Sequence, residues 1–394
     1  MILKIKHAVI YGLLFSMIFL HGSLSVASND IVVGMTGDMS NLSANIGLQM
    51  KKGIELGFAE ANSKGGIKGR SLRLIALDDE YIPLNAASNT RRLINDEQVV
   101  AMIGNVGTPM AMLAVPIVNK SKTLLFGAYT GAAMLRKSDV GCCVYNYRAS
   151  YKQEIGLMID HILQQGVKPH EIAFLTQKDA SGDTAYAVTL EKLNEYGFND
   201  FPELLHTRYR KNTLNIEQSV ADVLSAKKPP KAIIMISTYG ASTKFINLLK
   251  DELPKLKYYH ISYTGSVSLR RLLAKNVEGV YITSVVPNAD SNNAVTQAYR
   301  SALSTFGMDM DVGETSLEGY IVSKIFIEVL NSIQGEINKQ SILAAIGNVG
   351  LLKTDTGSAD LMLTETSRQA SQTVWLQEFI NGRFIEIAMK RGVE

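Results

Sequence analysis

Short apolar runs alternate with longer amphipathic stretches along most of the chain. The apolar runs predict strands at 31–35, 72–77, 99–104, 123–128, 171–176, 232–238, 257–263 and 279–286. Between most of them, apolar residues recur every three or four positions, which predicts helices at 47–62, 84–95, 110–120, 151–165, 183–196, 213–226 and 241–252. Strands that alternate with helices are typical of an α/β fold whose parallel sheets are covered on both faces.

The pattern changes toward the C-terminus. Further helices are expected near 292–306, 315–333 and 338–347. After them, the apolar runs 373–379 and 384–388 flank Asn381-Gly382, a dipeptide that favours a type I′ turn. We therefore expect a hairpin in this region.

The stretch A-N-S-K-G-G-I-K-G-R, residues 61–70, is rich in glycine and lysine. A phosphate-binding loop needs a strand, then a glycine loop, then a helix N-terminus whose free N–H groups meet the anion. Here the order is reversed, because the stretch follows the predicted helix at 47–62 and precedes the strand at 72–77. We therefore interpret the glycines as the end of the helix, where a left-handed residue is readily accommodated.

The first residues are expected to be removed. Lys4 and Lys6 precede an apolar run at 8–20, and Ser25-Val26-Ala27 suits a cleavage site, so residues 1–27 are typical of a secretory signal peptide. A membrane anchor is disfavoured because the run is shorter than the ~20 residues that span a bilayer. Removal takes away two lysines and no acidic residue, which lowers the formal net charge from +3 to +1. This charge gives no electrostatic reason to expect nucleic acid as a partner.

The 394-residue chain is long enough for two domains of ordinary globular composition, with 46% hydrophobic and 20% charged residues. It contains no H-E-x-x-H metal motif, no G-x-S-x-G elbow and no complete G-x-G-x-x-G motif. The sequence therefore predicts a protein without enzymatic activity, metal or cofactor. Cys142 and Cys143 are adjacent, so they either form a vicinal disulfide in an oxidising compartment or are a structurally minor pair.

Several predicted strands end in turns of small and polar residues. The turns are N-V-G-T-P at 105–109, A-Y-T-G at 128–131 and S-T-Y-G at 237–240. Ligands of open α/β sheets bind beyond the carboxyl ends of the strands, where hydroxyls and free N–H groups suit a small carboxylate. The alternative is that Thr108 and Thr130 only cap helices. Two such turns on neighbouring strands favour a binding site.

The sequence resembles one family over nearly the whole predicted mature chain. The segments A-N-S-K-G-G-I-K-G-R-S-L-R-L-I-A-L-D-D, V-V-A-M-I-G-N-V-G-T-P and V-E-G-V-Y-I-T, with the region of Ser150–Glu154, are similar to type I periplasmic solute-binding proteins, the leucine/isoleucine/valine-binding protein family. The resemblance implies an α/β fold of two Rossmann-like lobes with parallel central sheets, joined by a three-crossover hinge. The lobes would comprise 28–148 with 284–356, and 149–283 with 357–394.

The resemblance also implies ligand-binding positions. Thr108 falls where the family uses a hydroxyl for the ligand carboxylate. Ala128 and Thr130 fall where the family holds the amino group and the carboxylate, and Tyr239 matches an aromatic residue of the second lobe.

Two positions depart from the family's pattern. Ser181 stands where amino-acid binders place an aromatic residue, and Thr264 stands where they place a glutamate for the ammonium. A buried ammonium without a counter-charge would cost several kcal/mol. The departure therefore disfavours an α-amino acid as the ligand.

Some residues near these positions have two interpretations. The tyrosines Tyr129, Tyr147 and Tyr263 are candidates for lining the ligand with a flat ring and a polar edge, or for ordinary core packing. Arg148 is a candidate for an ion pair within the fold, which we favour, or for a second contact to an anion.

The resemblance implies an exported substrate-binding protein of an ABC-type importer, with a small amino-acid-like, aromatic or organic acid held in the cleft. It would work in the periplasm as a monomer and deliver the solute to a permease in the inner membrane. The alternative with the same fold is a ligand-sensing subunit of a signalling system. An exported enzyme is a third hypothesis, which the missing catalytic motifs disfavour.

Overall fold

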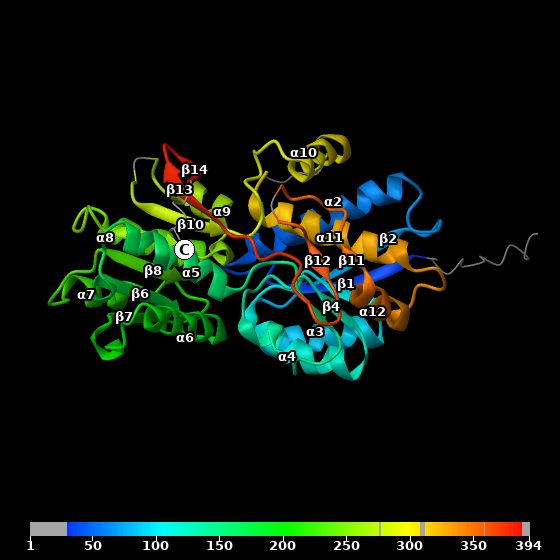
Figure 1. Ribbon diagram of the computed structural model, residues 1–394, viewed down its shortest axis with the longest axis horizontal. Coiled ribbons are helices and arrows are strands. Elements are labelled where there is room, and N and C mark those ends of the chain that lie inside the picture. The colour runs from blue at the N-terminus through cyan, green and yellow to red at the C-terminus, as the bar shows by residue number, and fades with distance from the viewer. Residues whose placement is uncertain (1–29, 276, 308–311, 358, 388–394) are drawn as a thin grey trace, which may run out of the picture. The chain divides into compact units, whose positions relative to one another are not determined.

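A computed structural model describes residues 30–387 except 276, 308–311 and 358. The predicted signal peptide, 1–27, lies outside the described residues. Two large sheets with helices packed against them form most of the described chain (Figure 1). Within these residues, no helix is both long enough and apolar enough to cross a membrane.

The first sheet is built from the N-terminal part of the chain. Its five strands are parallel and lie in the order β2-β1-β3-β4-β5. Their bounds are Ile31–Gly37 (β1), Leu72–Asp78 (β2), Ala101–Ile103 (β3), Leu124–Phe126 (β4) and Val144–Tyr145 (β5). Helices α2 (Ala44–Ser63) and α11 (Glu314–Ser332) lie on one side of the sheet, and α3 (Pro83–Asn95) and α4 (Thr108–Lys120) on the other (Figure 1).

The second sheet has seven strands in the order β14-β13-β10-β9-β8-β6-β7. Strands β6 to β10 are parallel, whereas β13 and β14 are antiparallel, so this sheet is mixed. The strand bounds are Ile172–Gln177 (β6), His206–Tyr209 (β7), Ala232–Ile236 (β8), Lys257–His260 (β9), Val280–Ser284 (β10), Trp375–Ile380 (β13) and Arg383–Glu386 (β14). The helices between them are α5 (Tyr151–Gln164), α6 (Ala180–Glu195), α7 (Glu217–Leu224), α8 (Tyr239–Leu249) and α9 (Ser266–Leu272).

Shorter elements complete the regular structure of the described residues. These are α10 (Ala294–Phe306), α12 (Lys339–Asn348), the paired strands β11 (Gly350–Leu351) and β12 (Met362–Leu363), and the 3-10 turns η1 (Ala133–Arg136), η2 (Pro169–Glu171), η3 (Phe201–Glu203) and η4 (Ser262–Thr264).

The chain passes between the two sheets three times. It leaves the first sheet after β5, returns after β10 to pack α11 against α2, and joins the second sheet again at β13. The predicted fold class, α/β with parallel central sheets, is therefore confirmed. The residue limits of the two lobes stay a prediction.

The terminal hairpin has the predicted turn. Asn381 has φ of 50° and Gly382 has φ of 83°, so both adopt the left-handed conformation that a type I′ turn requires. Strand β7 was not predicted, because its residues alternate between half-buried His206 and Arg208 and buried Thr207 and Tyr209. Such a strand contains no apolar run.

The glycines of the 61–70 stretch end a helix, as predicted. Helix α2 stops at Ser63, and Gly65 and Gly66 follow with φ of 94° and 69°. The Gly66 N–H donates to the carbonyl of Ala61 at 3.0 Å, which satisfies one of the last carbonyls of the helix.

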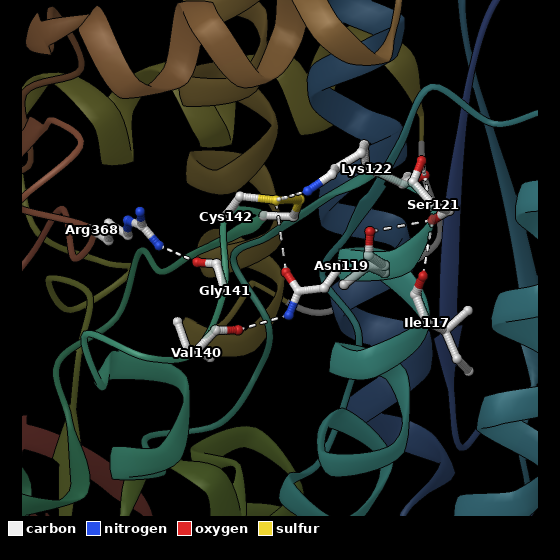
Figure 2. Close-up of a disulfide and its surroundings, with 11 residues drawn as sticks. Ile117, Asn119, Ser121, Lys122, Val140, Gly141, Cys142 and Arg368 are labelled. Carbon is white, nitrogen blue, oxygen red and sulfur yellow. Dashed lines mark hydrogen bonds between the residues drawn. A yellow bond between two sulfur atoms is a disulfide. The ribbon is translucent and has the colours of Figure 1, made fainter.

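Cys142 and Cys143 form a disulfide in the turn before β5. Figure 2 shows the side chains that hold this turn: Asn119 donates to a backbone carbonyl at 2.7 Å, and Arg368 donates to the carbonyl of Gly141. A Cβ atom at Gly141, whose φ is 99°, would collide with Asn119. Of the two interpretations of the cysteines, the structure contains the disulfide.

Glycines let α2 and α11 pack closely. A Cβ atom added at Gly53 would lie 2.0 Å from the carbonyl oxygen of Ser316. On the facing helix, a Cβ atom at Gly319 would lie 2.4 Å from the carbonyl oxygen of Met50. Helices approach to the distance that their contact side chains allow, so these glycines determine where α11 lies relative to the first sheet.

We expect Gly53→Ala to lower the free energy of unfolding by on the order of 3 kcal/mol, because the new methyl group has no space between the backbones. The matched control is Gly156→Ala in α5, where the nearest atom to an added Cβ, Cε of Lys192, is 3.8 Å away. The control should be neutral or stabilise by up to about 1 kcal/mol, since alanine favours a helix. Urea unfolding measures both variants, and equal effects would contradict the packing argument.

Candidate functional site

Two threonine hydroxyls meet at the carboxyl edge of the first sheet. Thr108 begins α4 and Thr130 follows β4, and their Oγ1 atoms are 2.7 Å apart. The hydroxyl of Tyr151, the first residue of α5, is 3.4 Å from each of them. Both threonines are fully buried. This threonine pair, Thr108 and Thr130, therefore presents uncharged hydroxyls at one point, an arrangement that suits a small anion.

The loops after β3 and β4 position the threonine pair. The two strands are parallel neighbours, so their carboxyl ends lie at the same edge of the sheet. Gly107 has φ of 97°, which glycine adopts without strain, and it turns the chain into α4. The Tyr129 N–H donates to the carbonyl of Asn105 at 2.7 Å, which ties one loop to the other.

The other two predicted residues of the first sheet have different surroundings. Ala128 packs in an apolar core cluster. The hydroxyl of Tyr129 donates to the carbonyl of Ser262 at 3.1 Å and lies 3.2 Å from the hydroxyl of Thr315. The Arg148 guanidinium lies 4.2 Å from the centre of its ring. Tyr129 thus joins the first sheet to η4 of the second.

The predicted residues of the second sheet have different surroundings. Tyr239 begins α8 half-buried, and its pKa is raised by burial, while a hydrogen bond with the backbone of Asn45 opposes this rise. Thr264 is fully buried and donates to the carbonyl of Ser237 at 3.0 Å, so its hydroxyl is used within the second sheet. Ser181 lies in the first turn of α6. Its buried hydroxyl has no hydrogen-bond partner among the described residues.

A second polar cluster lies between the sheets, and sequence analysis missed it. Tyr81, in the loop after β2, donates to Oδ2 of Asp179 at 3.0 Å. Gln177 donates to the same oxygen at 2.5 Å and accepts from the hydroxyl of Tyr209 at 3.1 Å. Asp179 is the first acidic residue after a predicted strand, the same kind of position that identified Thr108. Its position after a predicted strand could therefore have identified Asp179 from the sequence.

A buried ion pair lies where the chain first passes between the sheets. Nε of Arg148 is 3.3 Å from Oε1 of Glu318, and the two side chains are 1% and 2% exposed. The guanidinium also donates to the hydroxyl of Ser262. Burial raises the pKa of Glu318 to about 7, although Arg148 counteracts the rise. Arg148 therefore has the structural partner that we favoured.

A cavity of about 720 Å³ lies beside η1 and the start of α5, and Arg136 and Lys152 are among its lining residues. The threonine pair and Tyr151 do not line it, so this cavity is separate from the site. Arg136 donates to the carbonyls of Thr130 and Arg148 at 3.4 and 2.8 Å, so it connects the loop that contains Thr130 to the segment before α5. In the part of the chain that the structure describes, no three His, Cys, Asp or Glu residues are grouped so as to hold a metal ion.

Asp79 is a buried carboxyl group close to the second polar cluster. It accepts from the hydroxyl of Thr36 at 2.9 Å and from the N–H of Tyr81 at 3.0 Å. Burial raises the pKa of Asp79 to about 7, and the carboxylates of Asp38 and Asp78 add to the rise. The folded protein therefore binds a proton here more readily than the unfolded chain does.

We expect Asp79→Asn to change how stability depends on pH. The folded pKa, about 7, lies above the ordinary value of 3.8, so the stability that this group contributes is complete below 3.8 and is lost as pH rises through 7. As pH rises through this range, the free energy of unfolding of the wild type should fall by up to about 4 kcal/mol because of Asp79, and that of the variant should not show this fall. The raised pKa of Glu318 changes the pH dependence of stability in the same direction in both proteins, so it does not affect their difference. Urea unfolding between about pH 4.5 and 7.5 measures the difference, and parallel curves would refute it.

Known proteins resemble this chain over most of its length. The profile of the family described as periplasmic binding protein matches residues 30–383. Leu/Ile/Val-binding protein homolog 7 of Brucella abortus is 25% identical over 336 residues, which cover 80% of each chain. Homolog 2 of the same organism is 27% identical over 168 residues, so the match spans 43% of this chain and 44% of that protein.

The fold has a solved counterpart. The crystal structure of a possible leucine/isoleucine/valine-binding protein from Rhodopirellula baltica superposes with a TM-score of 0.88 and is 37% identical. The match covers 93% of this chain and 98% of that one. Because both the family profile and this structure cover most of the chain, the chain belongs to the type I periplasmic binding proteins of the leucine/isoleucine/valine-binding protein family.

Proposed function

We propose that this chain is the exported substrate-binding protein of an ABC-type importer and that it binds a small carboxylate-bearing solute. The observation that carries the proposal is the threonine pair, with hydroxyls 2.7 Å apart at the ends of adjacent parallel strands. The periplasmic binding protein family, to which the chain belongs, supports the coarser part of the proposal.

The solute carboxylate would lie between Thr108 and Thr130, beside the hydroxyl of Tyr151. Each hydroxyl donates one hydrogen. Without a ligand, one threonine accepts from the other. A carboxylate would accept from both, and hydrogen bonds to a charged acceptor are roughly twice as strong as neutral ones. Two hydrogen bonds to a carboxylate would therefore be more favourable than the single hydrogen bond between the two threonines.

Solute binding would be coupled to closure about the hinge. Contacts between the sheets support this view: Tyr129 donates to Ser262, Tyr81 donates to Asp179, and Asn45 lies 2.6 Å from the hydroxyl of Ser268. A solute that contacts both sheets binds better when these groups are together. It therefore shifts the equilibrium toward the closed state.

The remaining parts of the proposal concern cellular role. The protein would work in the periplasm after removal of residues 1–27, as a monomer without enzymatic activity, and would deliver its solute to a permease in the inner membrane. The family relationship supports the periplasmic location and the permease partner. The limits of the lobes, 28–148 with 284–356 and 149–283 with 357–394, belong to the same proposal.

Thermal unfolding of the mature protein with a panel of acids tests the function. The panel contains amino acids, their amine-free analogues and aromatic carboxylates. Solute at 100 times its dissociation constant should stabilise the protein by about 2.7 kcal/mol. Small-angle scattering should then show a smaller radius with the same solute. No shift with any carboxylate would contradict the proposed solute class, and a shift without a change in radius would contradict hinge closure.

We expect Thr108→Ala and Thr130→Ala each to weaken binding of the active carboxylate by about 10- to 100-fold, because each removes a hydrogen bond to a charged group. Thr90→Ala is the matched control, since Thr90 is a fully buried threonine whose hydroxyl donates to the carbonyl of Ala86 within α3. Calorimetric titration measures the affinities. Unchanged affinity in both site variants, or equal loss in the control, would mean that the carboxylate binds elsewhere.

A further inference from the structure

The cavity beside η1 lies where two passages of the chain between the sheets run side by side. The first passage, 146–150, joins β5 to α5, and the third passage, 364–374, joins β12 to β13. The Asn146 N–H donates to the carbonyl of Arg368 at 2.7 Å, and the Ala370 N–H donates to the carbonyl of Asn146 at 2.9 Å. Residues of both passages line the cavity, so a molecule bound in it would contact both.

Basic residues outnumber acidic residues in the walls of this cavity. Among the described residues, its basic lining residues are Arg136, Lys137, Lys152 and Arg368, and its one acidic lining residue is Glu365. Of the four basic residues, only Lys152 forms an ion pair with a described carboxylate, an exposed one with Glu195 at 3.5 Å. The walls therefore have an excess of positive charge, which attracts an anion.

The guanidinium of Arg136 is held in the cavity wall by neutral acceptors. Its Nε donates to Oε1 of Gln369 at 2.7 Å, and its terminal nitrogens donate to the carbonyls of Ala132 and Arg148 at 3.0 and 2.8 Å. Burial and the nearby charge of Arg148 lower the pKa of Arg136 to about 10. A cation in such surroundings is stabilised by an anion within a few ångströms, which the cavity has room for.

One buried acceptor at this cavity has no donor. Asn146 lines the cavity and is 1% exposed, and its Nδ2 donates to the carbonyls of Leu135 and Arg368 at 2.9 and 3.4 Å. Both partners are carbonyl oxygens, so the amide nitrogen must face them. Oδ1 of Asn146 has no hydrogen-bond partner among the described residues. Buried polar atoms are normally bonded, so this oxygen indicates a donor that the described chain does not supply.

We propose that this cavity binds a small oxyanion that keeps a hydroxyl hydrogen, of the hydrogenphosphate kind, and that the anion holds the first and third passages together. Its oxygens would accept from the lysine and arginine side chains, in charge-assisted hydrogen bonds. Its hydroxyl would supply the donor that Oδ1 of Asn146 lacks. The site is distinct from the threonine pair, which does not line the cavity, so the inference does not depend on the proposed solute.

Thermal unfolding of the mature protein in increasing phosphate, at constant ionic strength, tests the site. Sulfate is the matched probe, because it is a similar oxyanion that has no hydroxyl at neutral pH. The rise in melting temperature should saturate with phosphate, and the dissociation constant obtained for phosphate should be about 10-fold lower than that for sulfate. No rise with phosphate, or equal dissociation constants for the two anions, would overturn the proposal.

Lys137→Gln combined with Lys152→Gln tests the cations without disturbing the core, because both side chains are exposed. We expect this variant to bind phosphate about 10-fold more weakly than the wild type does, since two charges that attract the anion are lost. The matched control is Lys227→Gln combined with Lys228→Gln, which removes two exposed lysines after α7 that do not line the cavity. An equal loss in the control would reduce the effect to net charge and overturn the site.

Glu365→Gln should have the opposite effect. It removes the acidic side chain from the walls, so phosphate should bind about threefold more tightly to this variant than to the wild type. Damage to the fold would only weaken binding, so a gain in affinity separates the charge argument from a structural effect. Unchanged or weaker binding of phosphate would contradict the proposed position of the anion.

Hydrogen exchange locates the anion and separates this site from the threonine pair. At about ten times its dissociation constant, phosphate should slow exchange of the Asn146 and Ala370 N–H groups about 10-fold, because separating the two passages would release the anion. The slowing should persist in Thr108→Ala. If Thr108→Ala abolishes the effect of phosphate and the double lysine variant of the cavity retains it, the anion binds at the threonine pair. This inference is then wrong, and the proposed function stands.

Discussion

The buried ion pair of Arg148 and Glu318 stands where the chain first leaves the first sheet. Removing two charges from water is costly, and their attraction compensates only while both remain paired. The same guanidinium lies over the ring of Tyr129 and donates to Ser262. Groups from α11, the loop after β4 and η4 are thus arranged around one charge. The way in which the two sheets meet depends on keeping that charge paired.

This constraint extends to the proposed binding site through adjacent residues. Tyr129 and Thr130 follow one another on the loop after β4, and their side chains have different partners. The first contacts η4 and α11, and the second meets Thr108. A movement of the second sheet that shifts Ser262 therefore acts on the residue next to Thr130. Gly319, next to Glu318 on α11, packs closely against the backbone of α2, so the ion pair lies beside the contact between these two helices.

The two sides of the proposed cleft differ in their electrostatics. The first sheet offers the hydroxyls of the threonine pair, and the second offers the Asp179 carboxylate, which accepts from Tyr81, Gln177 and two N–H groups of α6. In the proposed function, a solute that contacts both sides would bind best when they are together, which would couple binding to closure.

The sequence alone determined those features that depend on neighbouring residues. The alternation of apolar runs and amphipathic stretches indicated the α/β fold, the glycines at 65 and 66 ended α2, and Asn381-Gly382 formed the hairpin turn. The closeness of Thr108 and Thr130 was also predictable, because parallel neighbouring strands end at the same edge of the sheet.

Only the tertiary structure decided which distant groups meet. Tyr81 and Asp179 are 98 positions apart, Tyr129 turned toward Ser262, and Thr264 bonded to Ser237. Helix and strand patterns reflect hydrogen bonds and burial within a few residues, so they are visible in a sequence. The direction of a side chain between two sheets depends on how those sheets pack, and no local pattern records it.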